Sequence, residues 1–155
     1  MNKLSIGSTL PDFTGIDQNG EELNASSFNG KRLVIYFYPK DNTPGCTVEA
    51  CNLRDNYATL KKKGFAILGV SADDDKKHLK FIEKYDLPFP LLADVELKVI
   101  KAYDVWGEKK FMGRTYMGTN RVTFLINEKG TIEHIIDKVE TKNHAAQVLN
   151  TWGLD

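Results

Sequence analysis

The sequence predicts an α/β fold in which helices cover both faces of a mixed central sheet. Two continuous apolar runs, at residues 33–38 and 65–71, have the β-branched and aromatic composition of strands buried on both faces. A helical pattern separates them, and a strand–helix–strand unit of this length predicts a right-handed parallel crossover. Residues 121–126 and 131–136, joined by a turn ending at Gly130, predict an antiparallel hairpin, which makes the sheet mixed.

Residues 1–30 predict a hairpin added at the edge of this sheet. Residues 13–16 and 22–23 flank the segment Asp17-Gln18-Asn19-Gly20. The dipeptide Asn-Gly is the strongest short-range signal for a tight hairpin turn. We therefore expect an N-terminal hairpin that extends the domain.

The helix after the first buried strand has a defined start and one apolar stripe. Thr43 suits the N-cap, and Pro44 suits the first helical position, where its missing N–H costs nothing. The stripe consists of Cys46, Ala50, Leu53, Tyr57 and Leu60. Cys46 therefore lies at the head of the inward-facing side.

Shorter elements complete the pattern. In chain order they are a helix from Asp73-Asp74-Asp75 through Tyr85, a strand at 91–93, a helix at 96–103 and a last helix capped by Thr141. We interpret the three aspartates as a solvated helix cap. Residues 104–120 show no clear period and predict a loop or irregular hairpin. We expect Trp106, Met112, Tyr116 and Met117 to pack this loop, with one wall of a substrate pocket as the alternative.

Composition narrows the class of function. A chain of 155 residues predicts a single domain, 1–155, with a substantial core. Lys+Arg and Asp+Glu number 21 each, so no basic excess favours nucleic acid. No stretch approaches the roughly 18 apolar residues of a membrane span, and no signal peptide is expected. We therefore expect a cytoplasmic protein whose two cysteines are reactive, since structural disulfides are rare in that compartment.

The position of Cys46 favours a thiolate. In the first helical turn its sulfur lies at the positive end of the helix dipole, near backbone N–H groups without intrahelical acceptors. Such surroundings can turn a thiol that is about 3% ionised at pH 7 into one that is mostly ionised, a gain of only about thirtyfold. Further donors must therefore stabilise the charge that moves during a reaction.

Three residues are candidates for this task. Thr43 offers a hydroxyl three residues before Cys46. Arg121 begins the third buried strand, which could approach the helix start if the strands are neighbours. Glu49, in the next turn, could orient that arginine. The alternative role for Thr43 is a simple helix cap, that for Arg121 is a solvated charge at a strand end, and that for Glu49 is an acid that pairs with a local neighbour.

Cys46 and Cys51 cannot form a disulfide within an intact helix. Five residues along an ideal helix separate the two α-carbons by roughly 8.6 Å. A disulfide requires about 4.4–6.8 Å. Pairing therefore requires the first one or two turns to unwind, so that the helix is folded for attack and locally melted for disulfide formation.

These residues resemble the active site of a known family. Pro39, Thr43 and Cys46 form the Pro-x-x-x-Thr-x-x-Cys signature of peroxiredoxins, and Arg121-Val-Thr-Phe-Leu resembles their active-site arginine strand. The segment Thr-Pro-Gly-Cys-Thr, with Cys51 five residues after Cys46, is similar to the bacterioferritin-comigratory-protein (peroxiredoxin Q) subfamily. The resemblance extends from Gly7 to the final helix.

The resemblance implies a thioredoxin-like fold and the reduction of hydrogen peroxide or organic hydroperoxides. Cys46 would be oxidised to a sulfenic acid, Cys51 would condense with it, and thioredoxin or a similar dithiol would reduce the disulfide. Thr43 and Arg121 would hold the peroxide oxygens, and Pro39 would shield the site. No cofactor is implied, and the subfamily suggests a monomer. Position 49 is Glu where the subfamily often has Gln, which leaves the coupling to Arg121 open.

Two other classes of function fit the residues less well. One is a disulfide-exchange electron carrier, against which the lack of a C-x-x-C pair counts. The other is a redox-regulated binding or holdase protein. No metal site is expected, because Cys46, Cys51 and the histidines at 78, 134 and 144 fall on separate elements without ligand spacing. We predict that these histidines lie on the surface.

Overall fold

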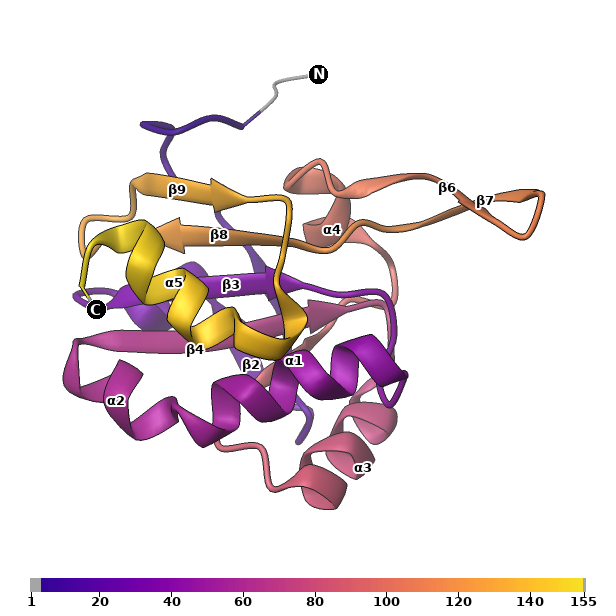
Figure 1. Ribbon diagram of the computed structural model, residues 1–155, viewed down its shortest axis with the longest axis horizontal. Helices are drawn as coiled ribbons and strands as arrows, with labels where there is room; N and C mark the ends of the chain where they lie inside the picture. Colours follow the sequence, from indigo (N-terminus) through magenta and orange to yellow (C-terminus); the bar gives the residue numbers. More distant parts are fainter. Residues whose placement is uncertain (1–3, 155) are drawn as a thin grey trace.

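The computed structural model describes residues 4–154, and its centre is one seven-stranded sheet of order β2-β1-β5-β4-β3-β8-β9 (Figure 1). Its strands are β1 (Thr14–Ile16), β2 (Glu22–Asn24), β3 (Arg32–Phe37), β4 (Phe65–Ser71), β5 (Leu91–Ala93), β8 (Val122–Ile126) and β9 (Ile132–Ile136). β3, β4 and β5 are parallel, whereas β8, β9 and the β1–β2 hairpin are antiparallel to their neighbours. The predicted mixed sheet and N-terminal hairpin are thus confirmed.

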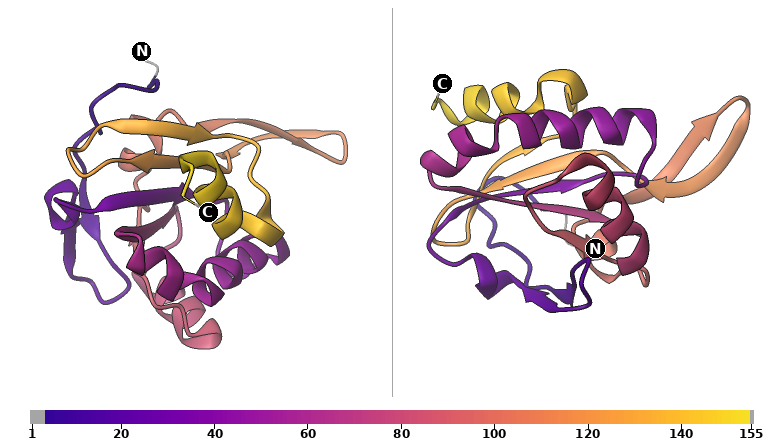
Figure 2. Two further views of the ribbon diagram at one scale, coloured as in Figure 1. Left: turned by 60° about the vertical axis from the view of Figure 1, so that its left-hand side comes forward. Right: turned by 90° about the horizontal axis from the view of Figure 1, so that it is seen from below.

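Helices cover the two faces unequally. They are α1 (Pro44–Asp55), α2 (Tyr57–Lys62), α3 (Asp75–Tyr85), α4 (Lys98–Ala102) and α5 (His144–Trp152), with short 3-10 turns η1 (Ala25–Phe28) and η2 (Thr141–Asn143). α1, α2, α3 and α5 pack on one face, whereas α4 and the N-terminal segment cover the other. Figure 2 (right) shows α1 and α5 together on one side and the N-terminal segment opposite.

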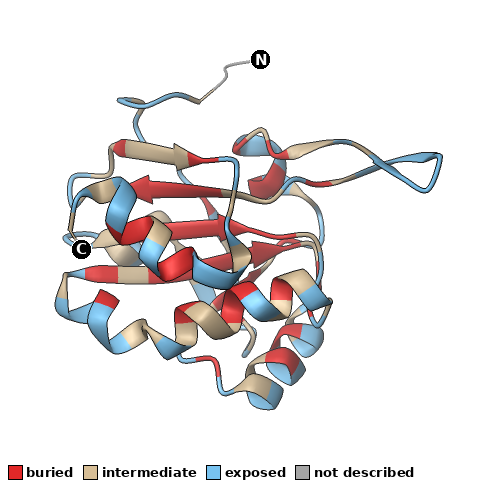
Figure 3. Cartoon of the chain, in the orientation of Figure 1, coloured by how far each residue is buried: buried red, intermediate tan, exposed pale blue. Residues whose placement is uncertain are grey.

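The central strands are apolar on both faces because both faces are covered. Val34 and Tyr36 of β3 contribute to the core under α1, while Leu33, Ile35 and Phe37 contribute to the core on the opposite face. Figure 3 shows β3, β4 and β8 as the most continuously buried strands. β3 therefore ends inside the molecule, and α1 begins from a fixed point.

The segment 104–120 is more regular than its sequence indicates. β6 (Trp106–Phe111) and β7 (Arg114–Thr119) form an antiparallel ribbon that projects from the domain (Figure 1). Met112 and Met117 are exposed, so the prediction that these side chains pack the loop is wrong. The ribbon has no buried outer face to impose a period on its side chains, and backbone pairing alone defines it.

The helix boundaries differ from the prediction in two places. The stripe from Cys46 to Leu60 spans two helices, with a break at Asn56. Thr141 does not cap the last helix, because the turn η2 intervenes and Asn143 takes the N-cap position. Within residues 4–154, no helix has the length and apolar character needed to cross a membrane.

Candidate active site

Cys46 lies in the first turn of α1, directly after the central strand β3. Its side chain is buried, with 1% relative exposure. Thr43 occupies the N-cap position with extended backbone, and Pro44 is the first helical residue, as predicted. The Thr43 hydroxyl, however, makes no capping hydrogen bond within the described chain; it donates to the Lys40 carbonyl at 2.9 Å. This bond uses the hydroxyl proton and leaves the oxygen lone pairs free to accept.

Sheet pairing brings Arg121 to the sulfur. Phe37 pairs with Val122 across the antiparallel β3–β8 ladder, so Arg121 lies beside the end of β3 and the start of α1. Its Nη2 donates to Cys46 Sγ at 3.3 Å, and its Nη1 donates to Glu49 Oε1 at 2.7 Å. Burial alone would lower the pKa of Arg121, but Cys46 and Glu49 beside it raise the pKa overall. The geometry thus brings together Cys46, Glu49 and Arg121 in the way that the sequence indicated.

Gly45 leaves room for this arrangement. A Cβ at this position would lie 3.2 Å from Arg121 Nη2. Any side chain would therefore press on the guanidinium that contacts Cys46. The sequence signal for Gly45 is its place next to Cys46 in the first turn of the helix.

Glu49 is an acid buried inside the domain. Its side chain has 0% exposure, and burial raises its pKa to about 7 despite the opposing effect of Arg121. Glu49 Oε2 faces His144 Nε2 at 3.5 Å. The spacing of three residues from Cys46 was a sequence signal that Glu49 lies beside the inward-facing stripe of α1, although a carboxyl group is seldom buried so completely.

His144 is buried, so its predicted surface position is wrong. It begins α5, and its Nε2 lies 2.8 Å from Thr123 Oγ1. Burial lowers the pKa of His144 to about 4. The spacing of four residues between His144 and the buried Val148 was a sequence signal that this histidine belongs to the inward face of the helix.

Cys51 lies two residues after Glu49 on the same helix. Both cysteines are free, and Cys51 is half-buried. The structure therefore shows the folded form, in which the helix holds the two sulfurs on different faces.

One wall of the site is formed by the projecting ribbon. A cavity of about 340 Å³ lies between Pro39 and the base of the ribbon, and its lining includes Trp106, Lys109 and Tyr116. Burial and Arg121 lower the pKa of Lys109, while Cys46 raises it, which shows that Lys109 belongs to the electrostatic surroundings of the sulfur. No sequence pattern indicated Lys109 as a residue of the site.

A second buried polar cluster lies beside the loop that leads into α1. His78 Nδ1 lies 2.6 Å from Asp41 Oδ2, and Asp73 Oδ2 accepts from the Asp41 backbone and from Ser71 Oγ. His78 and Asp73 are both buried. The predictions that His78 lies on the surface and that Asp73 is a solvated helix cap are therefore wrong. Asp74 does cap α3, through a bond from the Lys77 backbone N–H.

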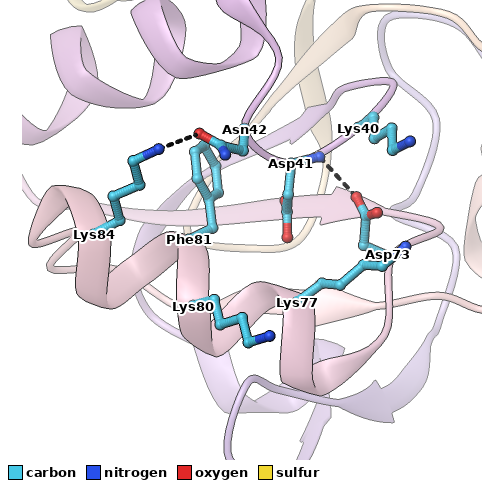
Figure 4. A pocket seen from close by; sticks show the side chains of 8 residues that line it. All are labelled: Lys40, Asp41, Asn42, Asp73, Lys77, Lys80, Phe81 and Lys84. Carbon is cyan, nitrogen blue, oxygen red and sulfur yellow. Dashed lines mark hydrogen bonds between the residues drawn. The ribbon is translucent and has the colours of Figure 1, made fainter.

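The same cluster could be considered as a metal centre. Ligand atoms of Asp41, Asp73 and His78 lie within 4.8 Å of one another. Each of these side chains already has hydrogen-bond partners in the protein, so the cluster is a satisfied polar core. Figure 4 shows Asp41 and Asp73 at the centre of a pocket rimmed by lysines, including Lys77 and Lys84.

Comparison with known proteins identifies the family. Residues 6–135 match the AhpC/TSA family. The chain is 50% identical over 150 residues to peroxiredoxin Bcp of Escherichia coli, covering 97% of this chain and 96% of that protein. A structure of a cysteine-to-serine variant of Xylella fastidiosa PrxQ superimposes with a TM-score of 0.91 at 32% identity, covering 99% and 98% of the two chains.

A second solved structure is that of the bacterioferritin comigratory protein from Xanthomonas campestris, studied for its alkyl peroxide reduction activity. It matches with a TM-score of 0.84 at 35% identity, over 91% of this chain and 90% of that one. These likenesses confirm the thioredoxin-like fold that the sequence predicted. The chain therefore belongs to the AhpC/TSA family, among its Bcp and PrxQ peroxiredoxins, and it is a thiol-dependent peroxidase.

Proposed function

We propose that Cys46 is the peroxidatic nucleophile and that Arg121, held by Glu49, is its principal electrostatic partner. The observation that carries this proposal is the pair of bonds from one guanidinium, to Cys46 Sγ and to Glu49 Oε1. A fixed, partly buried cation beside the sulfur stabilises the thiolate and needs little reorganisation when charge moves to the peroxide.

The first half-reaction oxidises this sulfur. The Cys46 thiolate attacks the terminal oxygen of ROOH, an S–O bond forms as the O–O bond breaks, and the departing RO⁻ takes a proton from solvent to leave as alcohol or water. Arg121 and the unpaired N–H groups of the first helical turn donate to the peroxide oxygens. The Thr43 hydroxyl oxygen accepts a hydrogen bond from the peroxide O–H, because its own proton is donated to the Lys40 carbonyl. Pro39 shields the site from bulk water.

The second half-reaction requires Cys51. With the start of α1 unwound, the Cys51 thiolate attacks the sulfenic sulfur of Cys46, a disulfide forms, and hydroxide leaves as water after taking a proton. Thioredoxin or a similar dithiol then reduces the disulfide. No further cofactor enters this cycle.

The substrates are hydrogen peroxide and organic hydroperoxides. The activity toward alkyl peroxides studied in the Xanthomonas campestris relative supports the organic class. We further propose that the chain works as a single cytoplasmic domain and as a monomer, without nucleic acid or membrane partners. The balanced count of 21 basic and 21 acidic residues supports the exclusion of nucleic acid.

Stopped-flow kinetics of two cysteine variants test these roles. Cys46→Ser should abolish rapid peroxide consumption, whereas Cys51→Ser should complete one turnover and then fail to be recycled by thioredoxin. Mass spectrometry of the peptide containing residues 46–51 should show a disulfide only in the unsubstituted protein after oxidation. Full steady-state turnover by Cys51→Ser would exclude its resolving role, and peroxide consumption by Cys46→Ser would exclude the nucleophile.

A further inference from the structure

The Glu49 carboxyl has two very different oxygen environments. Oε1 accepts from Arg121 Nη1 at 2.7 Å. Oε2 is buried and has no hydrogen-bond partner among residues 4–154, although it lies 3.5 Å from His144 Nε2. A buried charged oxygen without a hydrogen-bond donor costs free energy. Whether Glu49 can be ionised therefore depends on whether His144 Nε2 carries a proton that it could donate to Oε2.

Neighbouring backbone groups fix the protonation of His144. The Glu140 backbone N–H donates to Gln147 Oε1, and Gln147 Nε2 donates to the Lys138 carbonyl, which sets the orientation of the Gln147 amide. His144 Nδ1 lies 2.9 Å from the same Gln147 Oε1, an acceptor, so Nδ1 carries a proton.

In a neutral ring the other nitrogen, Nε2, then carries no proton and presents a lone pair. Burial lowers the pKa of His144 to about 4, so the ring is neutral near pH 7. Its Nε2 accepts from Thr123 Oγ1 at 2.8 Å and presents the same electron-rich side to Glu49 Oε2. An ionised Glu49 would place a carboxylate oxygen against this lone pair, whereas a protonated Oε2 has an acceptor in front of it.

The remaining titratable groups around Glu49 agree with a neutral acid. They are Cys46 on α1, Arg121 before β8, Tyr36 on β3 and His144 on α5. Burial, followed by Glu49, raises the pKa of Tyr36 well above its usual value, so its hydroxyl keeps its proton. Arg121 is then the cation that contacts both groups that can become anions, while Lys109 of β6 is a second cation in the surroundings of Cys46.

We propose that Glu49 carries a proton on Oε2 while Cys46 is a thiolate, and that neutral His144 is the positioning residue, because its Nε2 offers Oε2 a lone pair and no N–H donor. Arg121 then balances one negative charge at a time. When Glu49 ionises, a second anion competes with the thiolate for the same guanidinium and opposes the negative charge that develops on the leaving oxygen. Glutamine at position 49 reproduces the protonated acid, since its carbonyl can accept from Arg121 and its amide can donate to His144.

NMR on the reduced protein tests the proton directly, without measuring activity. The Glu49 carboxyl ¹³C signal should titrate near pH 7, in line with the pKa of about 7 for this acid. The ¹⁵N signals of His144 should show a neutral ring protonated on Nδ1, with a step in the Nε2 signal at the Glu49 titration that vanishes in Glu49→Gln. A Glu49 that is ionised at pH 6, or a His144 that is cationic or protonated on Nε2 at pH 7, would overturn the proposal.

The pH dependence of peroxide reduction tests the consequence, which rests on the proposed role of Cys46. The ratio of the rate constant of the unsubstituted protein to that of Glu49→Gln should fall roughly tenfold from pH 6 to pH 8.5, because the ionised carboxylate weakens the stabilisation of the leaving oxygen by Arg121 and so raises the barrier. Glu83→Gln, an exposed acid on α3, should leave the rate constant unchanged at every pH.

Two outcomes would contradict this consequence. A constant ratio across the pH range would show that Glu49 does not ionise there. A Glu49→Gln variant that is strongly impaired at all pH values would show that an ionised carboxylate is required. If instead Cys46 proved unreactive while the NMR result held, the proposed function would fail and the assignment of the Glu49 proton would stand.

Discussion

At the scale of single residues, the site depends on the planar fork of Arg121. One nitrogen of the guanidinium contacts Cys46 and another contacts Glu49, at 3.3 and 2.7 Å. A lysine would keep the positive charge but present it at a single point, so it could not hold both partners in this geometry. Shape matters here as well as charge.

We therefore expect Arg121→Lys to lower the second-order rate constant with peroxide by about 100-fold, the usual cost of losing one preorganised donor. The matched control is Arg114→Lys, on the exposed ribbon, which should leave the rate unchanged. Stopped-flow measurements on both variants check this. A loss below about threefold in Arg121→Lys would mean that charge alone suffices, in disagreement with the proposed role of the fork.

At the scale of elements, α1 is tied by hydrogen bonds to α3, to α5 and to the turn before α5 immediately after Cys51. Asn52 Nδ2 donates to the Lys142 carbonyl at 2.9 Å, and Asn52 Oδ1 accepts from the Ala145 backbone at 2.8 Å. Arg54 Nη1 donates to the Tyr85 carbonyl at 2.7 Å. These bonds tie α1 to α5 and α3 immediately after Cys51. The unwinding that disulfide formation requires should therefore stop at Asn52.

Hydrogen exchange should reveal this boundary. On oxidation, amides of residues 47–51, whose N–H groups are the first of α1 to have helical acceptors, should lose protection, while those of α2 should keep it. Asn52→Ala should extend the change through Asp55 and lower the free energy of unfolding by about 1–2 kcal/mol, because two hydrogen bonds are lost. Asn150→Ala, on the exposed side of α5, is the control. Protection that persists across residues 47–51 in the oxidised protein would contradict the unwinding.

At the scale of the whole molecule, two buried titratable groups make stability depend on pH with opposite signs. Glu49 has a raised pKa, from 4.5 to about 7, so its contribution is fully present below 4.5 and is lost as pH rises through 7. His144 has a lowered pKa, from 6.5 to about 4, so its contribution is present above 6.5 and is lost as pH falls through 4. Between about 4.5 and 6.5 the two slopes oppose each other.

Replacing Glu49 with glutamine should remove the pH dependence of stability that the ionisation of Glu49 contributes. The free energy of unfolding of Glu49→Gln, relative to the unsubstituted protein, should increase by roughly 3 kcal/mol between pH 4.5 and pH 8. Urea titrations at several pH values would measure this difference in the free energy of unfolding. For the exposed control Glu83→Gln, the difference from the unsubstituted protein should not change with pH. A pH-independent difference for Glu49→Gln would show that this acid is ionised over the whole range in the native protein.

Much of the fold followed from local patterns in the sequence. The runs at 33–38 and 65–71 were predicted as buried strands because a strand covered on both faces has apolar residues at consecutive positions. Thr43 and Pro44 placed the start of α1, and with it Cys46, because helix starts have local chemical signals. The ribbon β6–β7 was less evident, since a two-stranded ribbon outside the core leaves no period in its side chains.

The sequence by itself determined the fold class, the helix that carries Cys46 and the residue types around it. Only the tertiary structure decided how these groups are charged. Burial of Glu49 and His144 depends on how α5 packs against α1, and the pairing of β3 with β8 brings Arg121 to both Cys46 and Glu49. Desolvation and charge pairing arise from contacts between segments up to about a hundred residues apart, and no local pattern along the chain encodes them.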